Sequence, residues 1–352
     1  MIRPLPMILG ILLLLAAPAI DFGLGPIPRE RIYPSVTNRF GPFHWIHGQI
    51  YEKETPVDIA FMGSSLIWGN INTPYVRQEL SSRSGTDAEV ITLGWKWAGY
   101  DVLLAVASDL LSERKVKTIV IYDEGVDSPE VPHPHSQRIV RWHDDPVLFS
   151  SLTAGQKTTL YAGSLLGLPR QTLTRFRRDL PDTGSIYRDG VGNTLDLSLT
   201  SGAWIDEAKE INPDVGFGIH PLFPEARTIT PISYGAGSAD RFSFLEDGDE
   251  SYQAAFAKRL FELCEARGTR LVMIHLPTAG ERLSPEIPVR APEDWFAKDG
   301  PVLLGIPPDE LFAGLDAASV DELYKDGRHM TSAFQSAFTR LITPALLEAH
   351  GQ

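Results

Sequence analysis

The stretch Val57-Asp58-Ile59-Ala60-Phe61-Met62-Gly63-Ser64-Ser65 decides the fold class of this protein. Its first six residues are mostly apolar, and they end at a glycine that is followed by two serines. A short apolar run bounded by turn residues is typical of a strand that is buried on both faces. Such strands occur mainly in parallel sheets, whose strands are joined by helical crossovers. We therefore expect 57–62 to be the first strand of an α/β domain.

The rest of the chain continues this alternation of strands and helices. An N-cap and a first-turn proline at Asn72, Thr73 and Pro74 predict a helix to about Arg83. Apolar runs and helical spacings then predict a strand over 89–93, a helix over 102–111, a strand over 117–122, a helix over 252–267, a strand over 270–275 and a C-terminal helix around 334–346. Right-handed crossovers between these strands predict the order 2-1-3-4, with a fifth strand at one edge.

Two segments lack this pattern and define the expected domain organisation. Residues 22–55 are rich in Pro and Gly, and we expect a linker that becomes ordered against the domain. Residues 128–249 are too long for a plain loop, which predicts a large insertion that forms a lid or subdomain. The main domain is therefore expected over 56–352.

The first 21 residues indicate export. Arg3 is the only charge before Asp21, an apolar stretch runs over 7–20, and Ala17-Pro18-Ala19 has the small-x-small form of a cleavage site. These features are typical of a secretory signal peptide. An uncleaved membrane anchor is the alternative, because seventeen residues from Pro4 to Ile20 are near the lower limit for a spanning helix. A buried core helix is a further alternative, although the stretch is not amphipathic.

Composition and charge exclude several classes of protein and disfavour several kinds of partner. The 352 residues are 43% hydrophobic and 22% charged, which is typical of a globular protein and excludes a disordered or polytopic membrane chain. The net charge of −13 disfavours nucleic acid and anionic membrane surfaces as partners. The single cysteine, Cys264, excludes an intramolecular disulfide and a Cys-rich zinc site. No metal and no cofactor are expected.

Two short motifs carry candidate catalytic groups. A serine directly after the first strand of a parallel sheet lies at the edge where reactive groups collect, so Ser65 is a candidate nucleophile. Ser and Gly are also ordinary turn residues, which is the alternative interpretation. Asp326 lies three residues before His329, a spacing that lets its carboxylate bond Nδ1 and leave Nε2 as a general base. Because this spacing also arises by chance, its place before the last helix carries more weight.

Taken together, these motifs resemble the SGNH/GDSL hydrolase superfamily. The resemblance rests on Gly63-Ser64-Ser65, on Gly94 after the second strand and on Asp326-x-x-His329 before the last helix. It covers about 56–125 and 250–349, and it is closest to the membrane-anchored cell-envelope branch, with its teichoic-acid D-alanylation and polysaccharide O-acetylation proteins. It implies a flavodoxin-like three-layer α/β/α sandwich with a parallel sheet. It also implies Ser65 as nucleophile, His329 as base, Asp326 as its orienting partner, and an oxyanion hole formed by the amides of Ser65 and Gly94.

The sequence departs from the family pattern in two places. Ser64 replaces the usual Asp before the nucleophile. The third block usually supplies an Asn side chain to the oxyanion hole, whereas this chain reads Tyr122-Asp123-Glu124-Gly125, and an ionised carboxylate cannot donate a hydrogen bond. The loss of one oxyanion donor typically costs ~10²–10³ in kcat. Residues expected to line the substrate site are Trp68, Trp95, Trp97 and Arg328, although the tryptophans also suit core packing and the arginine a solvated surface.

The favoured hypothesis is an exported serine esterase or O-acyltransferase. Its substrate would be an acylated carbohydrate or a lipid-linked sugar of the cell envelope. The protein would be located in the periplasm or in another extracytoplasmic space. The alternative is a non-catalytic scaffold with the same fold, which binds polysaccharide or a protein of envelope polysaccharide assembly. Hydrolysis and transfer share an acyl-enzyme on Ser65, and they differ in whether water or a sugar hydroxyl accepts the acyl group.

Overall fold

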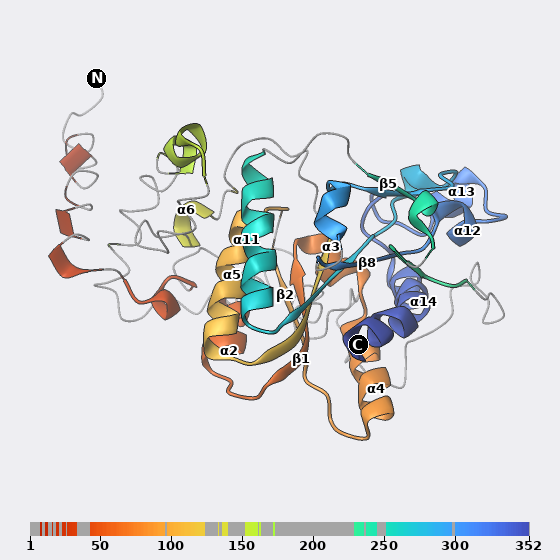
Figure 1. The fold of residues 1–352 in the computed structure, drawn as a ribbon, viewed down its shortest axis with the longest axis horizontal. Helices are drawn as coiled ribbons and strands as arrows, with labels where there is room; N and C mark the ends of the chain where they lie inside the picture. Colours follow the sequence, from red (N-terminus) through yellow and green to blue (C-terminus); the bar gives the residue numbers. More distant parts are fainter. Residues whose placement is uncertain are drawn as a thin grey trace.

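A computed structural model of the 352-residue chain shows how these segments are arranged (Figure 1). The structure describes residues 43–123 except 96, 229–244 except 236, and 251–351 except 298 and 299. It also describes scattered positions before 34 and between 133 and 172. Most of the segment expected to be a lid or subdomain, and most of the expected export segment, therefore lie outside the described residues.

A six-stranded sheet forms the centre of the molecule (Figure 1). In spatial order its strands are β2 (Val90–Gly94), β1 (Val57–Gly63), β3 (Val116–Tyr122), β6 (Arg270–Ile274), β8 (Val302–Gly305) and β4 (Ile232–Ser233). All neighbours are parallel except β4, which pairs antiparallel with β8. The predicted order 2-1-3-4 with a fifth strand beyond it is confirmed, and β4 extends the sheet by one antiparallel edge strand.

Strand β1 is buried on both faces, as the apolar run predicted. Ile59 and Phe61 belong to one hydrophobic cluster, whereas Ala60 and Met62 belong to the other. All four side chains are fully buried. Since successive side chains of a strand point to opposite faces, β1 contributes to both cores of a layered domain.

Helices cover both faces of the sheet (Figure 1). On one side lie α2 (Phe43–Tyr51), α5 (Tyr100–Glu113) and α11 (Tyr252–Ala266), and on the other lie α3 (Ser65–Asn70), α4 (Thr73–Ser84) and α14 (Ser332–Gly351). Shorter elements are η1 (Arg29–Arg31), α6 (Ser136–Ile139), η3 (Ala239–Arg241), η4 (Ala279–Glu281), η5 (Glu293–Phe296), α12 (Pro308–Leu311) and α13 (Ala317–Asp321). The domain is a three-layer α/β/α sandwich, and this confirms the predicted fold class.

Two segments contain elements that the sequence analysis did not predict. The segment 22–55, expected to be a linker that becomes ordered against the domain, includes helix α2, whose Ile46 and Ile50 are buried in the core. The segment 277–308, for which the sequence predicts no element, contains β8 of the main sheet and β7 (Ile287–Val289). Strand β7 pairs with β5 (Phe242–Phe244) in a second, two-stranded sheet. The sequence did not predict where these short strands lie along the chain, because tertiary pairing, and not a strong local pattern, forms them.

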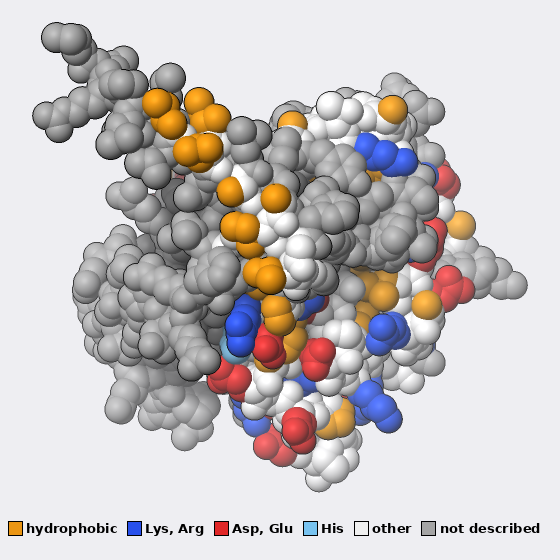
Figure 2. All heavy atoms as spheres, turned by 90° about the vertical axis from the view of Figure 1, so that its left-hand side faces the viewer, with side chains coloured by type: hydrophobic (Ala, Val, Ile, Leu, Met, Phe, Trp, Pro, Cys, Tyr) orange, Lys and Arg blue, Asp and Glu red, His pale blue; other side chains and the backbone are white. Residues whose placement is uncertain are grey.

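Apolar side chains are exposed in the described part of the N-terminal segment. Ile8, Ile11, Leu12 and Leu24 are each about half exposed or more, and a row of hydrophobic side chains crosses the face that Figure 2 shows. Within the described residues, no helix combines the length and the apolar character needed to cross a membrane. The predicted signal peptide or anchor over 1–21 stays a prediction.

Hydrogen bonds hold the segment around Arg29 and Tyr33 against helix α5. The Arg29 guanidinium donates to the Asp109 carboxylate, with Nη2 2.6 Å from Oδ2, and the buried Tyr33 hydroxyl donates to the same oxygen. Ile27 and Ile32 beside them are buried. Burial and proximity to Asp109 hold the pKa of Tyr33 well above its usual value, so Tyr33 remains a hydrogen-bond donor.

We expect Asp109→Ala to lower the free energy of unfolding by about 1.5–3 kcal/mol, because a charged acceptor is removed from two donors. Trypsin should also cleave faster after Arg29, whose side chain loses its anchor. Urea unfolding and timed digestion measure the two effects. The matched control is Asp87→Ala, which breaks an exposed ion pair with Arg77 that is worth about 0–1 kcal/mol. Equal effects of the two substitutions would contradict this docking role.

Candidate active site

The nucleophile turn follows β1 directly. Gly63 has φ of +150°, a backbone conformation that residues with side chains rarely adopt, and it turns the chain out of the sheet. Ser64 is the N-cap of α3, because its Oγ accepts a hydrogen bond from the Leu66 amide at 3.3 Å. The same Oγ lies 2.6 Å from the Tyr122 hydroxyl at the end of β3. The second contact holds the turn to the end of β3, and Ser65, the first residue of α3, is partly exposed.

The second half of the site is the tight turn before α14. Asp326 Oδ1 accepts the amide of His329 at 2.8 Å, so the aspartate side chain closes its own turn. Gly327 has φ of +78°, in the left-handed region that favours glycine. An antiparallel bridge between Tyr324 and Met330 closes the base of the turn, and both residues are buried. The Asp-Gly sequence is therefore the local signal for the turn. Burial of Tyr324 and Met330 on either side of it fixes the turn to the domain.

Ser65, His329 and Asp326 form a continuous hydrogen-bonded chain. Ser65 Oγ lies 2.9 Å from His329 Nε2, and His329 Nδ1 lies 2.7 Å from Asp326 Oδ2. Partial burial acts to raise the pKa of Asp326, but hydrogen bonds from the His329 amide and ring outweigh it and lower that pKa. An ionised carboxylate only accepts hydrogen bonds, so Nδ1 carries the proton and Nε2 is free to accept from Ser65. This is the order of contacts that the motifs predicted.

Asn70 is a site residue that the sequence analysis missed. It is the last residue of α3, and it is fully buried. Its Nδ2 donates to the carbonyl oxygen of Arg328 at 2.9 Å, and its Oδ1 accepts the amide of Met330 at 2.8 Å. An asparagine near the end of a short helix is ordinary in a sequence, so no local signal distinguished it.

The residues assigned to the oxyanion hole lie at neighbouring strand ends. Gly63 pairs with Gly94 in the β1–β2 ladder, which brings Gly94 beside the turn that carries Ser65. The next amide along β2, that of Trp95, donates to the Gly63 carbonyl at 3.0 Å and is therefore already used. The assignment of the Ser65 and Gly94 amides as oxyanion donors stays a prediction.

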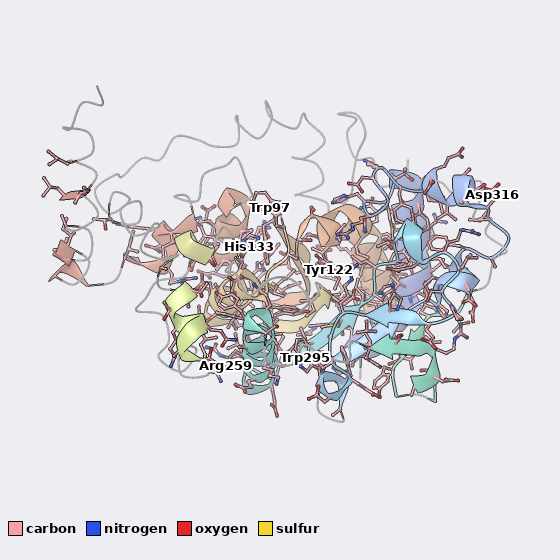
Figure 3. The ribbon with its side chains drawn as sticks, turned by 90° about the horizontal axis from the view of Figure 1, so that it is seen from above. Trp97, Tyr122, His133, Arg259, Trp295 and Asp316 are labelled. Atoms are coloured by element: carbon pink, nitrogen blue, oxygen red, sulfur yellow. The ribbon has the colours of Figure 1, made fainter. Side chains whose placement is uncertain are left out.

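The residues expected to line the substrate site fall into different environments. Trp95 is fully buried in a hydrophobic cluster, which makes it a packing residue and not part of an open surface. Trp97 is 50% exposed, has φ of +65°, and its ring centroid lies 6.2 Å from that of His133 (Figure 3). Arg328 is exposed on the Asp326–His329 turn. The side chain of Trp68 lies outside the described residues.

Asp123, which stands where the family pattern expects an asparagine, contacts a buried histidine. His275 follows β6 and is 2% exposed, and its Nδ1 lies 3.4 Å from Asp123 Oδ2. Its Nε2 lies 2.9 Å from Glu281 Oε2. Burial by itself lowers the pKa of His275, but the two carboxylates outweigh it and raise that pKa to about 10. With this pKa, His275 keeps its proton at neutral pH and lies as a buried imidazolium between two acids.

This ionic cluster is connected to the turn that carries His329. Glu281 belongs to η4, whose first residue, Ala279, donates its amide to the carbonyl oxygen of Gly327 at 3.0 Å. The Tyr324 hydroxyl donates to the carbonyl oxygen of Pro277 at 2.7 Å. The segment after β6 is therefore hydrogen-bonded directly to the turn that carries His329.

The described residues contain no group of three His, Cys, Asp or Glu side chains that could hold a metal ion. Cys264 is buried in α11, and burial raises the pKa of its thiol to about 12. The thiol therefore stays protonated at neutral pH and is a poor nucleophile.

We expect His275→Gln to lower the free energy of unfolding by about 3–5 kcal/mol at pH 7, because the buried carboxylate of Asp123 and the partly buried carboxylate of Glu281 lose their cationic partner. In the wild type, the folded state keeps the His275 proton up to pH about 10, whereas an unfolded histidine releases it near pH 6.5. The stability that this proton provides is complete below pH 6.5 and is lost as the pH rises through about 10.

Urea unfolding at several pH values between 6 and 10 measures this dependence. The decline should be much shallower in His275→Gln. It should persist in His350→Gln, because burial lowers the pKa of His350 and so moves its titration away from pH 10. An unchanged decline in His275→Gln would contradict the assignment of a buried imidazolium.

Comparison with known proteins adds no family to this description. No family model matches the sequence, and no curated protein matches it. The resemblance to SGNH/GDSL hydrolases therefore rests on the motifs around Ser65, Gly94 and His329. What the structure establishes is an α/β/α domain in which a Ser-His-Asp chain of hydrogen bonds lies beside the carboxyl ends of β1 and β2.

Proposed function

We propose that this protein is a serine esterase or O-acyltransferase that uses Ser65 as its nucleophile. The observation that carries the proposal is the chain of hydrogen bonds from Ser65 through His329 to Asp326, with distances of 2.9 and 2.7 Å. A nucleophile within reach of a base, which is itself oriented by a third group, is the signature of covalent acyl transfer.

The geometry supports a two-step reaction. Ser65 Oγ attacks the carbonyl carbon of an ester while its proton moves to His329 Nε2, and the imidazolium is stabilised by Asp326. The tetrahedral intermediate then releases the alcohol, which takes the proton from Nε2, and an acyl-enzyme remains on Ser65. Water or a second hydroxyl attacks this acyl group while His329 Nε2 accepts its proton. The bond between the acyl carbon and Ser65 Oγ then breaks, Oγ takes the proton from Nε2, and the acid or the new ester is released.

The substrate class that we propose is an acyl ester of a cell-envelope glycan or lipid-linked sugar, outside the cytoplasm. The net charge of −13 favours a neutral or cationic substrate. Trp97, half exposed on the loop after β2, offers an aromatic face to a sugar ring. The export features of residues 1–21 support the location, as signal peptide or as membrane anchor.

One observation favours the alternative of a non-catalytic scaffold for polysaccharide or for an assembly protein. The position that supplies an oxyanion donor in the resembling family holds Asp123, which contacts His275. An SGNH-like site without that donor is expected to be slower by ~10²–10³ in kcat. A direct test of Ser65 reactivity separates a slow enzyme from a scaffold.

We expect Ser65→Ala and His329→Ala each to reduce hydrolysis of p-nitrophenyl acetate by at least about 10³-fold, to the background rate. The double variant should lose little more than either single variant, because the two groups act as one unit. A fluorophosphonate should label the wild type at Ser65 and leave Ser65→Ala unlabelled.

The matched control is Ser64→Ala in the same turn. The substitution removes an N-cap and costs about 0.5–2 kcal/mol of stability. The Ser64 hydroxyl bonds the Leu66 amide and the Tyr122 hydroxyl, so we expect the variant to keep most of the activity. No turnover and no labelling of folded wild-type protein would favour the scaffold. An equal loss from Ser64→Ala would mean that the wrong serine has been assigned.

A further inference from the structure

The side chain of Asn70 bonds the backbone on both sides of His329. Its Nδ2 donates to the carbonyl oxygen of Arg328, the residue before the histidine, at 2.9 Å. Its Oδ1 accepts from the amide of Met330, the residue after it, at 2.8 Å. Both polar groups of one fully buried amide are thus satisfied by the main chain of the turn, and neither bonds the helix on which Asn70 lies.

This arrangement has the pattern of one rung of a parallel β-ladder. A residue in such a ladder also bonds the carbonyl of one residue and the amide of the residue two positions later in the neighbouring chain. The peptide groups on either side of His329 are therefore held in place, which limits rotation of the backbone at the histidine itself. The position of the imidazole then depends on the position of Asn70.

The same short helix carries the nucleophile. Helix α3 begins at Ser65 and ends at Asn70, so its two ends lie about 7.5 Å apart at a rise of 1.5 Å per residue. One end contacts the ring of His329 and the other holds the backbone of His329. A single rigid element thus determines where both reacting side chains lie.

We propose that Asn70 is a positioning residue that holds His329 in hydrogen-bond reach of Ser65. The proposal rests on the proposed function and deepens it. Asn70 touches neither reacting atom, so its effect is expected on the rate of the chemical step and not on substrate binding. A displacement of about 1 Å from reacting geometry can cost on the order of 10² in rate.

The chain offers a close comparison two residues further on. Asn72 is also buried, but its bonds lead elsewhere: its Nδ2 lies 3.3 Å from Ser336 Oγ on α14, and its Oδ1 accepts the amide of Tyr75 at the start of α4. Asn72→Ala therefore removes a buried asparagine from the same region without touching the turn that carries His329.

The experiment compares Asn70→Ala, Asn70→Asp and Asn72→Ala in the full chain, with p-nitrophenyl acetate as the probe. We expect Asn70→Ala to lose about 10²-fold in kcat with little change in KM, whereas Asn72→Ala should stay within about threefold of the wild type. Asn70→Asp keeps the acceptor for Met330 but places a carboxylate against the Arg328 carbonyl, so its kcat should also fall.

Amide hydrogen exchange at Met330, followed by NMR, provides a readout that does not depend on activity. Exchange should become at least about tenfold faster in Asn70→Ala and stay close to the wild-type rate in Asn70→Asp and Asn72→Ala, because only the first variant removes the acceptor. Thermal unfolding of each variant shows whether it is folded. If Asn70→Ala does not fold, the loss of kcat is measured in Asn70→Asp instead.

Several outcomes would overturn the proposal. Unchanged kcat in Asn70→Ala with fast exchange at Met330 would show that the contact does not position the base. Unchanged exchange at Met330 would show that the contact is absent. Equal losses of kcat in Asn70→Ala and Asn72→Ala would indicate a general loss of stability. An inactive wild type with slow exchange at Met330 would instead refute the proposed function and leave the contact as a structural one.

Discussion

Strand β1 is hydrogen-bonded to a parallel neighbour along both of its sides, and the position of the candidate site depends on this constraint. Parallel strands end at the same edge of a sheet, so the turns that follow β1, β2 and β3 must meet there. The pairing of Gly63 with Gly94 and the contact between Ser64 and Tyr122 are direct consequences. A shift of register by one residue would turn the buried side chains of β1 to the opposite face and move the nucleophile turn with them.

The catalytic groups that we propose come from opposite ends of the domain sequence. Ser65 and His329 are separated by 264 positions, yet each lies on a local structure that is largely self-contained. The serine turn is closed by a glycine and an N-cap, and the histidine turn by an aspartate and a glycine. What remains for the tertiary structure is to place two rigid turns against each other. Packing of α14 against α3 and α4 does this, with Met330 and Phe334 in the same hydrophobic cluster as Ile67.

The buried cluster of Asp123, His275 and Glu281 shows how a different residue can be accommodated at a position where the resembling family has an asparagine. A buried carboxylate without a partner is costly, but Asp123 and Glu281 both contact His275, whose pKa is raised so that it keeps its proton between them. The cluster joins the ends of β3 and β6 to η4, which in turn supports the histidine turn. The contact with His275 therefore explains why Asp123 is buried at this position. A role as an oxyanion donor is not required for that explanation.

Local patterns were sufficient to predict much of this domain. The apolar run of β1, the cap and proline before α4, the stripe of α11 and the Asp-Gly turn at 326–327 each contain their own signal, because neighbouring residues alone decide hydrophobic period, capping and turn geometry. From these signals the order of the first strands and the candidate roles of Ser65, Asp326 and His329 followed.

The sequence by itself thus determined the layered α/β architecture and the two turns that carry the candidate catalytic groups. Only the tertiary structure decided the rest: α2 as part of the helical layer, the short strands β4 and β8, the buried Trp95, the charge of His275 and the contact of Asn70 with the histidine turn. Each of these depends on a partner far away along the chain. A side chain such as that of Asn70 has the same local context whether it caps a helix or holds a distant loop, and only the packed core brings that loop within hydrogen-bond distance.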